Sequence, residues 1–273
     1  MSRSDRRRNE RMDRIMAEEI RVVELTADNM CQLACCGIKD TEHEGRVVKT
    51  KWMNNYFKKG LKAKIVLGDK DIQAGYIEYL PGEYAWRAVD ANGYMFIHCL
   101  WIHLKKYQKQ GHATRLIQSC IDDARKAKTN GVVVIARKKP WLANSEIFLK
   151  SGFEVIDTAP PDYELLVKKF KVSTPNPRLK DNWDRKLNKY GKGLTIIRSN
   201  QCPHTVRFAD KIAEMAEKTY RLRPQMVELK AYRDAQNAPT PYSAFAVIYN
   251  GQLLADHQIS ATRFRNIMNK VLQ

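Results

Sequence analysis

The sequence predicts an α/β (α+β) fold in which a mixed sheet flanked by helices is followed by a second, smaller α/β unit. Two patterns support this prediction. Apolar runs and amphipathic stretches alternate as strand, helix, strand, helix and strand over the first 170 residues, an order typical of a sheet covered by helices. After a basic interruption that contains prolines, the alternation begins again near residue 193. The chain therefore divides into two parts, and no internal repeat relates them.

The first elements are predicted from apolar runs and their boundaries. The strand "IRVVELT" is followed by a helix start that Asp28 would cap. An amphipathic stretch ending in Gly60 predicts the next helix, because glycine commonly follows the last helical turn. The segment "AKIVLGDKDIQAGYIEYLPG" predicts two strands around the turn "GDKD". These elements span 20–26, 28–36, 45–60 and 63–82.

The next strand, "GYMFIHCLWIHL", is apolar on both faces, which is expected of a strand in the middle of its sheet. An apolar rhythm of helical period follows, and then a buried strand, "GVVVIA". A short helix ending in Gly152 and a last strand, "YELLVKKF", complete the first part. These elements span 93–104, 113–128, 131–136, 144–153 and 163–170.

Residues 171–192, "KVSTPNPRLKDNWDRKLNKYGK", interrupt the alternation with two prolines and an excess of positive charge. They are interpreted as a linker or a short connecting helix. The second part, 193–273, then predicts four strands and two helices, and the second helix begins at residue 260. The first helix spans 203–220. The strands are 194–199, 227–230, and "AFAVIY" and "QLLAD" around the turn "NG".

The composition limits the classes of protein to which the chain can belong. With 44% hydrophobic residues among 273, the chain can bury a core, so global disorder is not expected. Its 48 basic and 30 acidic side chains give a net charge of +18, which favours anionic partners such as phosphates or nucleic acid. Residues 1–19 are interpreted as a basic tail, either solvated or an arm that binds nucleic acid.

No apolar segment follows the basic tail as it would in a secretory signal, and no run approaches the roughly 18 apolar residues of a membrane span. A cytoplasmic protein with free thiols and no membrane contact is therefore expected. Adjacent Cys35 and Cys36 do not match the usual spacings of paired zinc ligands, so no metal site is predicted.

The turn "YQKQGHA" lies between the long strand and the helix that follows it. Such a turn leaves several backbone N–H groups pointing to one place, and with the positive end of the helix dipole they suit a phosphate. Gly111 has no side chain to obstruct a ligand, and Ala113 has a small one. The turn lacks the Gly-Lys-Ser/Thr ending of a triphosphate loop and the three glycines of a dinucleotide motif.

Gln108, Gly111 and Ala113 match the signature Gln/Arg-x-x-Gly-x-Gly/Ala of the GCN5-related N-acetyltransferase (GNAT) superfamily, which residues 20–170 resemble. The segment "IFLKSGFEV" stands in the place of the closing motif of that superfamily. The segments "IEYLPGEYAWRAV", "IHCLWIH" and "FLKSGFEVIDTAPPDYELLVKKF" resemble the YoaP-like acetyltransferases, which join such a domain to a carboxy-terminal one. This second resemblance covers nearly the whole chain.

The resemblance implies a GNAT-type sheet and transfer of an acetyl group from acetyl-CoA, the co-substrate, to an amine. It implies that the central strand separates from its neighbour at a bulge, so that backbone groups of Trp101, Ile102 and His103 pair with the pantetheine arm. The amides of the turn would hold the diphosphate, and Asn144 is a further expected contact. The expected cofactor-binding residues of the turn are Gln108, Lys109, Gln110, Gly111, His112, Ala113 and Thr114.

The general acid usual in the superfamily is a tyrosine in the short helix, after Phe148, and this chain has Leu149 there. Tyr163, in the next strand, and Tyr94 are the candidates to replace it. The reaction does not require either one, because a coenzyme A thiolate can take its proton from water.

The glutamate base of the central strand is also missing, since its position is Ile97. The candidate bases are Glu78, Glu83 and His98, the last because histidine titrates near neutrality. Aromatic residues near the two glutamates could line an amine pocket through cation–π contact. The alternatives stay open that Glu78 is a solvated strand residue and that His98 is a hydrogen-bonded core histidine.

The second part, 193–273, resembles thioredoxin-like folds in the corner "CPHT" between its first strand and helix. The resemblance implies that Cys202 lies at a helix amino terminus, whose dipole lowers the pKa of a thiol, and that Pro241 is a cis proline facing it. Thr205 replaces the second cysteine, which excludes a two-cysteine disulfide oxidoreductase. A monothiol role for Cys202, and a recognition or dimerisation module without thiol chemistry, both remain open.

These observations predict an N-acetyltransferase whose acceptor is the amine of a small molecule or a protein, attacking the thioester directly. Two alternatives stay open. The same reaction could act on RNA or a ribosomal protein, which the charge of +18 would suit, or the chain could be a non-enzymatic coenzyme A-binding module. The first part is expected to bind acetyl-CoA without the second, and a homodimer is an open alternative to a monomer.

Overall fold

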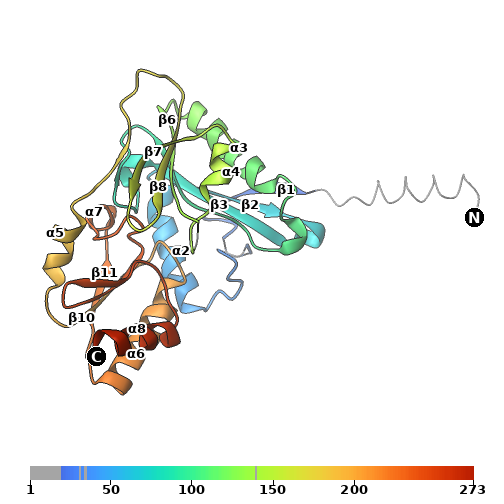
Figure 1. Cartoon of the computed structure of the whole chain (residues 1–273). Helices are drawn as coiled ribbons and strands as arrows, with labels where there is room; N and C mark the ends of the chain where they lie inside the picture. The colour runs from blue at the N-terminus through green and yellow to red at the C-terminus, as the bar shows by residue number, and fades with distance from the viewer. Residues whose placement is uncertain (1–19, 31, 34–35, 139) are drawn as a thin grey trace, which may run out of the picture.

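A seven-stranded mixed sheet forms the framework of the first part of the chain, in the strand order β1-β2-β3-β5-β6-β8-β7 (Figure 1). The computed structural model describes residues 20–30, 32–33, 36–138 and 140–273, so the basic tail predicted at 1–19 lies outside the described residues. Neighbouring strands are antiparallel except β5 and β6, which run parallel. The strands are β1 (Arg21–Leu25), β2 (Lys62–Leu67), β3 (Gln73–Pro81), β5 (Met95–Ile102), β6 (Gly131–Ala136), β7 (Glu154–Ala159) and β8 (Tyr163–Lys169).

Different helices cover the two faces of this sheet, as the predicted layer fold requires. Ile65 of β2 packs in one apolar cluster with Met53, which belongs to helix α2 (Glu44–Phe57). The next residue, Val66, packs in another cluster with Leu116 of helix α3 (His112–Lys126). Because successive side chains of a strand point to opposite faces, α2 and α3 lie on opposite faces of the sheet. A short helix, α4 (Ser145–Leu149), packs beside α3.

The helix predicted over 28–36 is wrong for the described residues of that segment, which form turns. Arg46 explains the difference, because its guanidinium bonds to the backbone carbonyls of Met30 and Leu33. The Asn29 side chain also accepts a hydrogen bond from the Thr26 amide, which favours a local turn. Carbonyls that a helix would use are therefore bonded to a side chain from α2.

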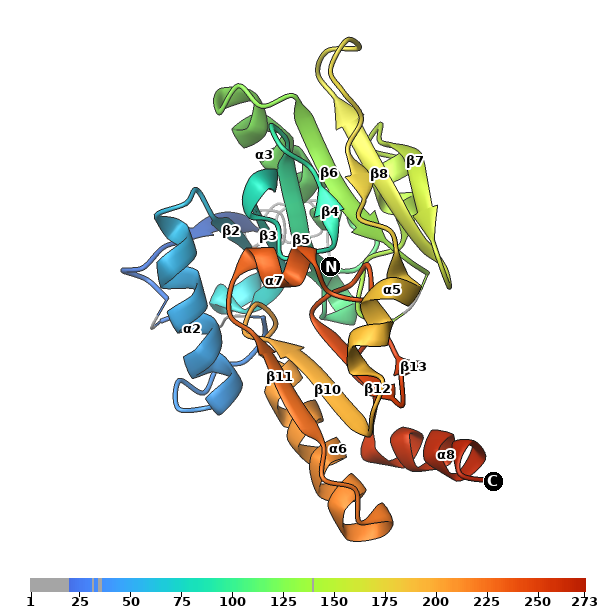
Figure 2. The same ribbon diagram turned by 90° about the vertical axis from the view of Figure 1, so that its left-hand side faces the viewer.

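A four-stranded sheet in the order β11-β10-β12-β13 forms the second part (Figure 2). Strands β10 and β11 are parallel, and the other two pairs are antiparallel. Helix α6 packs against β10, and α8 packs against α6. The elements are β10 (Leu194–Ser199), α6 (Thr205–Tyr220), β11 (Gln225–Leu229), α7 (Tyr232–Gln236), β12 (Phe245–Tyr249), β13 (Gln252–Ala255) and α8 (Ala261–Val271). Asn250 and Gly251 have positive φ in the predicted hairpin turn.

Residues 171–192 are folded onto the rest of the molecule instead of forming an extended spacer. Strand β9 (Arg178–Leu179) pairs with β4 (Val89–Asp90), and the buried Leu179 side chain joins a core cluster. Helix α5 (Trp183–Leu187) follows, so the short connecting helix is the correct alternative. Single turns of 3₁₀ helix lie at Asp69–Asp71, Gly82–Tyr84, Lys105–Tyr107 and Asn188–Tyr190.

The two sheets share their apolar cores, so the parts are joined by packing as well as by the chain. One cluster contains Phe96 of β5 together with Ile196 of β10 and Phe245 of β12. The other contains Trp52 of α2 with Ile197 of β10. We infer that neither part buries its apolar surface without the other.

The prediction of a cis proline at Pro241 is wrong. Among the described residues the one cis peptide bond joins Pro160 and Pro161. The turn that contains Pro241 is closed by side-chain bonds instead, since Thr240 Oγ1 accepts the Ser243 amide at 3.2 Å and Ser243 Oγ donates to the Thr240 carbonyl at 3.1 Å. Ser243 takes a positive φ of 58° there, so the chain reverses at Ser243 with Pro241 in the trans form.

Candidate active site

Strands β5 and β6 separate partway along their length. They pair over residues 95–97 and 132–134 only, although β5 continues to Ile102. On its other side β5 stays paired with β3 as far as Ile102, opposite Gly75. On the β6 side, the far end of β5 therefore has no neighbouring strand, whereas on the β3 side the His103 amide donates to the Ala74 carbonyl at 3.0 Å. The pairing of Trp101, Ile102 and His103 with a pantetheine arm stays a prediction.

A bulge at His98 marks the point where the strands separate. In the pairing of β3 with β5, Glu78 lies opposite Cys99 and Tyr79 lies opposite Ile97, which leaves His98 as the extra residue. Bulges bend a strand and increase its twist. The bulge therefore directs the end of β5 away from β6 and places the His98 side chain beside Glu78.

The turn that leads into α3 has the geometry of an anion cradle. Lys109 and Gly111 have positive φ, 61° and 81°, and Gly111 is the residue before the first helical turn. None of the backbone amides of residues 109–114 donates a hydrogen bond among the described residues. A Cβ placed on Gly111 would meet no atom within 4 Å, so the space beside Gly111 is open. Such a set of amides suits a diphosphate.

Side chains of the turn connect it to the separated end of β5. Gln108 Nε2 donates to the Ile102 carbonyl at 2.9 Å, and Gln110 Nε2 donates to the Lys106 carbonyl. The buried His112 ring lies 3.3 Å from Gln110 Oε1. Lys106 pairs with Asp69 at 2.7 Å, which reduces the charge available to a phosphate. The structure thus brings the predicted turn residues and β5 together, with the Ile102 carbonyl already bonded.

The other predicted cofactor contacts lie around this region. The rings of Trp101 and His103 pack with centroids 4.6 Å apart, and burial lowers the pKa of His103. Asn144 Oδ1 accepts the Glu146 amide at 3.3 Å, so its side chain caps α4. Leu149, at the position of the usual tyrosine acid, is 45% exposed.

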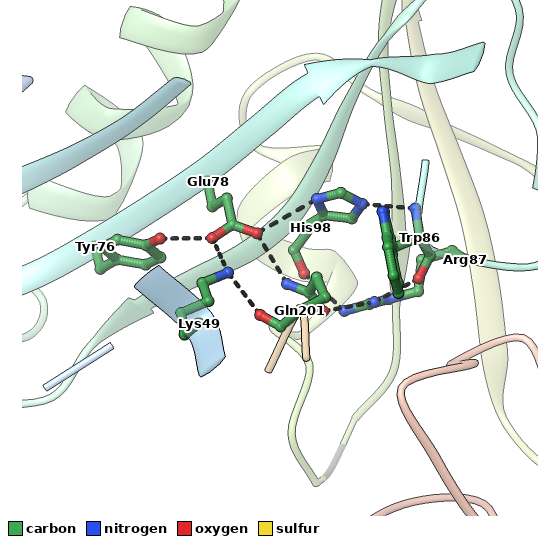
Figure 3. A network of polar contacts seen from close by, with 7 residues as sticks. All are labelled: Lys49, Tyr76, Glu78, Trp86, Arg87, His98 and Gln201. Atoms are coloured by element: carbon green, nitrogen blue, oxygen red, sulfur yellow. Dashed lines mark hydrogen bonds and ion pairs between the residues drawn. The ribbon is translucent and has the colours of Figure 1, made fainter. Parts of the chain in front are cut away.

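Glu78 is fully buried in a network of polar contacts, which excludes the solvated alternative (Figure 3). Its Oε2 lies 2.5 Å from Lys49 Nζ and accepts the Tyr76 hydroxyl at 2.6 Å. Its Oε1 accepts Gln201 Nε2 at 2.9 Å. Burial alone would raise the pKa of the Glu78 carboxyl, but the Lys49 charge and the contact with His98 outweigh it and hold the pKa well below its usual range. The carboxylate is ionised and bonded on both oxygens.

His98 has a neighbour at each ring nitrogen. Nε2 accepts the Trp86 amide at 2.9 Å, which places the ring proton on Nδ1, 3.4 Å from Glu78 Oε1. This second contact is longer than a good hydrogen bond. Burial, more than any other cause, lowers the pKa of His98 to about 4, and the Arg87 charge acts in the same direction. The ring is neutral at pH 7, and its accepting nitrogen is already bonded.

Tyr163 and Tyr94 are bonded to later segments of the chain. The Tyr163 hydroxyl donates to Asp256 Oδ2 at 2.8 Å and accepts Arg137 Nη1 at 2.9 Å. Burial, followed by the Asp256 charge, raises the pKa of Tyr163 far above its ordinary value. The Tyr94 hydroxyl donates to the Pro175 carbonyl at 2.6 Å. Neither tyrosine lines the cavity at the separated end of β5.

A cavity of about 320 Å³, the splay cavity, lies beside the separated end of β5. Residues from both parts of the chain form the wall of this cavity, so the cavity is complete only when the second part is present. The sequence did not predict that Arg87, Gln201 and Tyr242 line a site, because no local pattern distinguishes them from other residues of the same types. A larger hollow of about 950 Å³ lies against α5, β13 and α8 and includes no β5 residue. The splay cavity is lined by Cys36, Arg87, His98, Cys99, Leu100, Trp101, Trp141, Leu142, Gln201, Cys202, Pro203, His204 and Tyr242.

The "CPHT" corner faces the splay cavity, but its thiol is not activated. Burial, the largest cause, raises the pKa of Cys202, so the predicted lowering by the helix dipole is wrong. Cys202 Sγ lies 3.4 Å from the Gln258 side-chain nitrogen. Thr205 Oγ1 donates to the Ser199 carbonyl at 2.8 Å, so the residue that replaces the second cysteine ties α6 to β10. Burial also raises the pKa of Cys99, to about 12.

Within the described ranges, His, Cys, Asp and Glu side chains do not gather in any group of three or more that could hold a metal ion. In the same part of the chain, every helix is too short or too polar to cross a bilayer.

Comparison with known proteins shows similarity to N-acetyltransferases. Residues 225–266 match a family model described as YoaP-like. The chain is 29% identical over 259 residues to "Uncharacterized N-acetyltransferase YoaP" of Bacillus subtilis (strain 168), covering 90% of this chain and 98% of that protein. The predicted resemblance to YoaP-like acetyltransferases is confirmed by this similarity.

Solved structures of N-acetyltransferases are also similar to this chain. One is the GNAT family N-acetyltransferase YhbS from Escherichia coli in complex with CoA, at 14% identity and a TM-score of 0.40, covering 60% of this chain and 91% of that chain. Another is the PaiA N-acetyltransferase from Thermoplasma acidophilum in complex with coenzyme A, at 12% identity and a TM-score of 0.36, covering 56% of this chain and 99% of that chain.

Proposed function

We propose that this chain transfers the acetyl group of acetyl-CoA to the amine of a small molecule or a protein, by direct attack of the amine on the thioester. The observation that carries the proposal is the row of amides at residues 109–114, which donate no hydrogen bond among the described residues. A diphosphate held there would lie next to the separated end of β5. The similarity to the Bacillus subtilis relative named as an N-acetyltransferase supports the same activity.

Two places on this chain would hold acetyl-CoA. The amides of residues 109–114 would bind the diphosphate, with Gly111 leaving the approach open. The edge of β5 at Ile102 would pair with the pantetheine arm, after Gln108 releases the Ile102 carbonyl. Trp101 and His103 would flank this contact, because the His103 amide already donates to the Ala74 carbonyl. A contact from Asn144 would require its side chain to leave the cap of α4.

The chemistry needs a neutral amine, a donor for the oxyanion and a proton for the leaving thiolate. The amine nitrogen bonds to the carbonyl carbon, the carbon–sulfur bond breaks, and water carries the proton that the amine loses to the thiolate. Backbone amides at the separated end of β5 would stabilise the oxyanion. Glu78 and His98, with their polar atoms engaged, would serve as positioning residues of the splay cavity.

The second part would complete the acceptor site in this proposal. Its strand order β11-β10-β12-β13, with one parallel and two antiparallel pairs, supports a thioredoxin-like arrangement. The raised pKa of Cys202 favours a recognition module over a thiol catalyst. The cytoplasmic location and the homodimer stay predictions.

Calorimetric titration of the full chain with acetyl-CoA, followed by an assay of free thiol release with a panel of amines, tests the proposal. We expect one binding site and thiol release that depends on an added amine. A chain that is folded but gives no heat with acetyl-CoA would refute the proposed function. Binding with no amine-dependent release would instead favour the non-enzymatic coenzyme A-binding module.

Acetylation of RNA or a ribosomal protein stays a second candidate because of the net charge of +18. Binding to such a partner would weaken steeply as salt is added, because basic side chains displace counterions from phosphates. The assay should therefore include RNA at two salt concentrations. Thiol release that requires RNA and disappears at the higher concentration would favour this candidate over a small amine.

A further inference from the structure

Among the described residues that line the splay cavity, Arg87 is the one side chain with a fixed charge. Every other titratable group there for which a shift is resolved is held neutral near pH 7. Burial lowers the pKa values of His98 and His204 and raises those of Cys99, Cys202 and Tyr242. The described part of the wall is therefore mainly neutral, with one positive charge at its side.

The Arg87 guanidinium is buried, with 3% of the residue exposed, and its acceptors are all uncharged. Nη1 donates to the Trp86 carbonyl at 2.7 Å and to Gln201 Oε1 at 2.9 Å. Nη2 donates to the His98 carbonyl at 3.2 Å. These three bonds use three of the five N–H groups that an arginine carries.

No carboxylate among the described residues forms an ion pair with Arg87, although most buried charges in proteins are paired. The nearest network carboxylate, Glu78, is bonded to Lys49. A buried cation without an anion is costly, because its lost hydration is not replaced by an opposite charge. An anionic group of a ligand in the splay cavity would supply that charge.

The other residues of the cavity wall indicate the size and polarity of the rest of the ligand. Trp101, Trp141, Tyr242, Leu100 and Leu142 give it an aromatic and aliphatic lining. Its volume of about 320 Å³ is at the lower end of the range for small-molecule sites, roughly 300–1,000 Å³. A planar guanidinium binds a carboxylate through two parallel hydrogen bonds, which matches the N–H groups that remain on Arg87.

We propose that the acetyl acceptor is a small amine that also carries a carboxylate and an apolar side chain, an amino acid in chemical class, and that Arg87 binds its carboxylate. The inference rests on the proposed acetyl transfer, because the splay cavity adjoins the end of β5 where the thioester would lie. The acceptor nitrogen forms the new bond to the acetyl carbon, the carbon–sulfur bond breaks, and the proton passes from nitrogen to sulfur. The carboxylate is unchanged.

Matched pairs of acceptors test the proposal on the unmodified full chain. The pairs are L-leucine with L-leucinamide and L-phenylalanine with L-phenylalaninamide, and kcat/KM is measured by thiol release at saturating acetyl-CoA. The amides have the more easily deprotonated amine, so intrinsic reactivity favours them. We expect the acids to be preferred at least about tenfold, the size of one charge-assisted hydrogen bond. Equal rates, or a preference for the amides, would overturn the inference.

Variants of Arg87 then test whether this side chain causes the preference for the acids over the amides. Arg87→Gln should abolish the preference for the acid, while acetyl-CoA affinity measured by calorimetry stays unchanged. Arg87→Lys keeps the charge without the planar fork, so it should keep part of the preference. Arg137→Gln is the matched control, since Arg137 is also buried but pairs with Asp162 and Asp256 and does not line the cavity. A preference that survives in Arg87→Gln would overturn the role of Arg87.

The binding measurement separates failure of this inference from failure of the proposed function. A chain that binds acetyl-CoA and acetylates a peptide amine but neither amino acid would overturn this inference and leave the proposed function standing. A chain that does not bind acetyl-CoA would overturn both. The comparison of acids with amides uses the unmodified chain, so it remains decisive if Arg87→Gln does not fold.

Discussion

Lys49 and Glu78 form an ion pair in which both side chains are fully buried, with 2.5 Å between Nζ and Oε2. The pair also joins the two parts of the chain. Lys49 Nζ donates to the Gln201 carbonyl at 2.6 Å, and Gln201 Nε2 donates to Glu78 Oε1 at 2.9 Å. The corner before α6 is thus fixed against β3 and α2. Because Gln201 and the corner after it line the splay cavity, the ion pair positions that part of its wall.

Replacing one partner of this ion pair should destabilise the protein strongly. Glu78→Gln leaves Lys49 as a buried charge without an anion, and Lys49→Met leaves Glu78 without a cation. Each should lower the free energy of unfolding by roughly 3–5 kcal/mol. The double variant should cost less than the sum of the two by ~1–3 kcal/mol, because no charge stays unpaired. Urea unfolding at pH 7 measures all three, and strict additivity would contradict the coupling.

Replacing Gly111 should affect cofactor binding more than stability. Gly111→Ala forces a Cβ onto a residue with φ of 81°, which costs ~1–2 kcal/mol, and the Cβ would enter the open space beside Gly111. We expect acetyl-CoA affinity to fall about tenfold or more. Gly193→Ala is the control, since Gly193 has φ of 70° and equally open surroundings. It should lose similar stability and bind acetyl-CoA normally; equal affinity in both variants would argue against the cradle.

Tyr163→Phe separates a structural tyrosine from a catalytic acid. The variant removes a hydroxyl that donates to Asp256, so the free energy of unfolding should fall by ~1–3 kcal/mol. We expect kcat to stay within about threefold, whereas loss of a general acid costs ~100-fold or more. Tyr94→Phe is the control, because its hydroxyl also bonds to a carbonyl of a later segment. A large fall in kcat for Tyr163→Phe alone would restore its role as the acid.

Cys202 should react slowly with thiol reagents. Burial raises its pKa, so the thiolate fraction at pH 7.5 is lower than that of free cysteine. We expect alkylation by iodoacetamide to be at least about tenfold slower than for N-acetylcysteine. Peptide mass spectrometry assigns the modified residue, with Cys202→Ser as the control. Alkylation faster than the free thiol would support the monothiol role.

Local patterns predicted most elements of the fold because each needs only its neighbours in sequence. The turn at Gly111 follows from a glycine between a strand and a helical apolar rhythm, and the hairpin at Asn250 follows from the residues that favour positive φ. The strand β7 was not predicted. Its residues are exposed or half-buried except for the buried Ala159, so the segment shows no apolar run.

The features that the sequence predicted wrongly or did not predict depend on residues far apart in the sequence. Arg46 bonds to carbonyls that a helix at 28–36 would have used, and no pattern within that segment reveals it. Burial in the folded chain raises the pKa of Cys202, although its own corner predicted the reverse. The bond from Gln201 to Glu78 joins residues 123 positions apart. The anion cradle was therefore predictable, whereas the wall of the splay cavity was not.

His98 should make the protein less stable as the pH falls from about 6.5 to about 4. The pKa of His98 is lowered from 6.5 to about 4 in the folded state, chiefly by burial. Between these values the unfolded chain binds a proton that the folded chain does not, so acid favours unfolding. The loss from this group should total roughly 3 kcal/mol and be complete below about pH 4. At pH 7 and above, His98 contributes no such loss.

His98→Gln isolates this effect, because glutamine can still accept the Trp86 amide and donate to Glu78 while it does not titrate. Urea unfolding of both proteins at pH 7.5, 5.5 and 4.5 should show a smaller fall in the free energy of unfolding for the variant. Glu78, whose pKa is lowered by Lys49 and His98 against the effect of burial, adds a further loss below about pH 4.5. The part of that loss due to Lys49 remains in the variant, so the difference at pH 5.5, above the range in which Glu78 titrates, reports His98. Parallel pH profiles would mean that His98 is not held neutral by its burial.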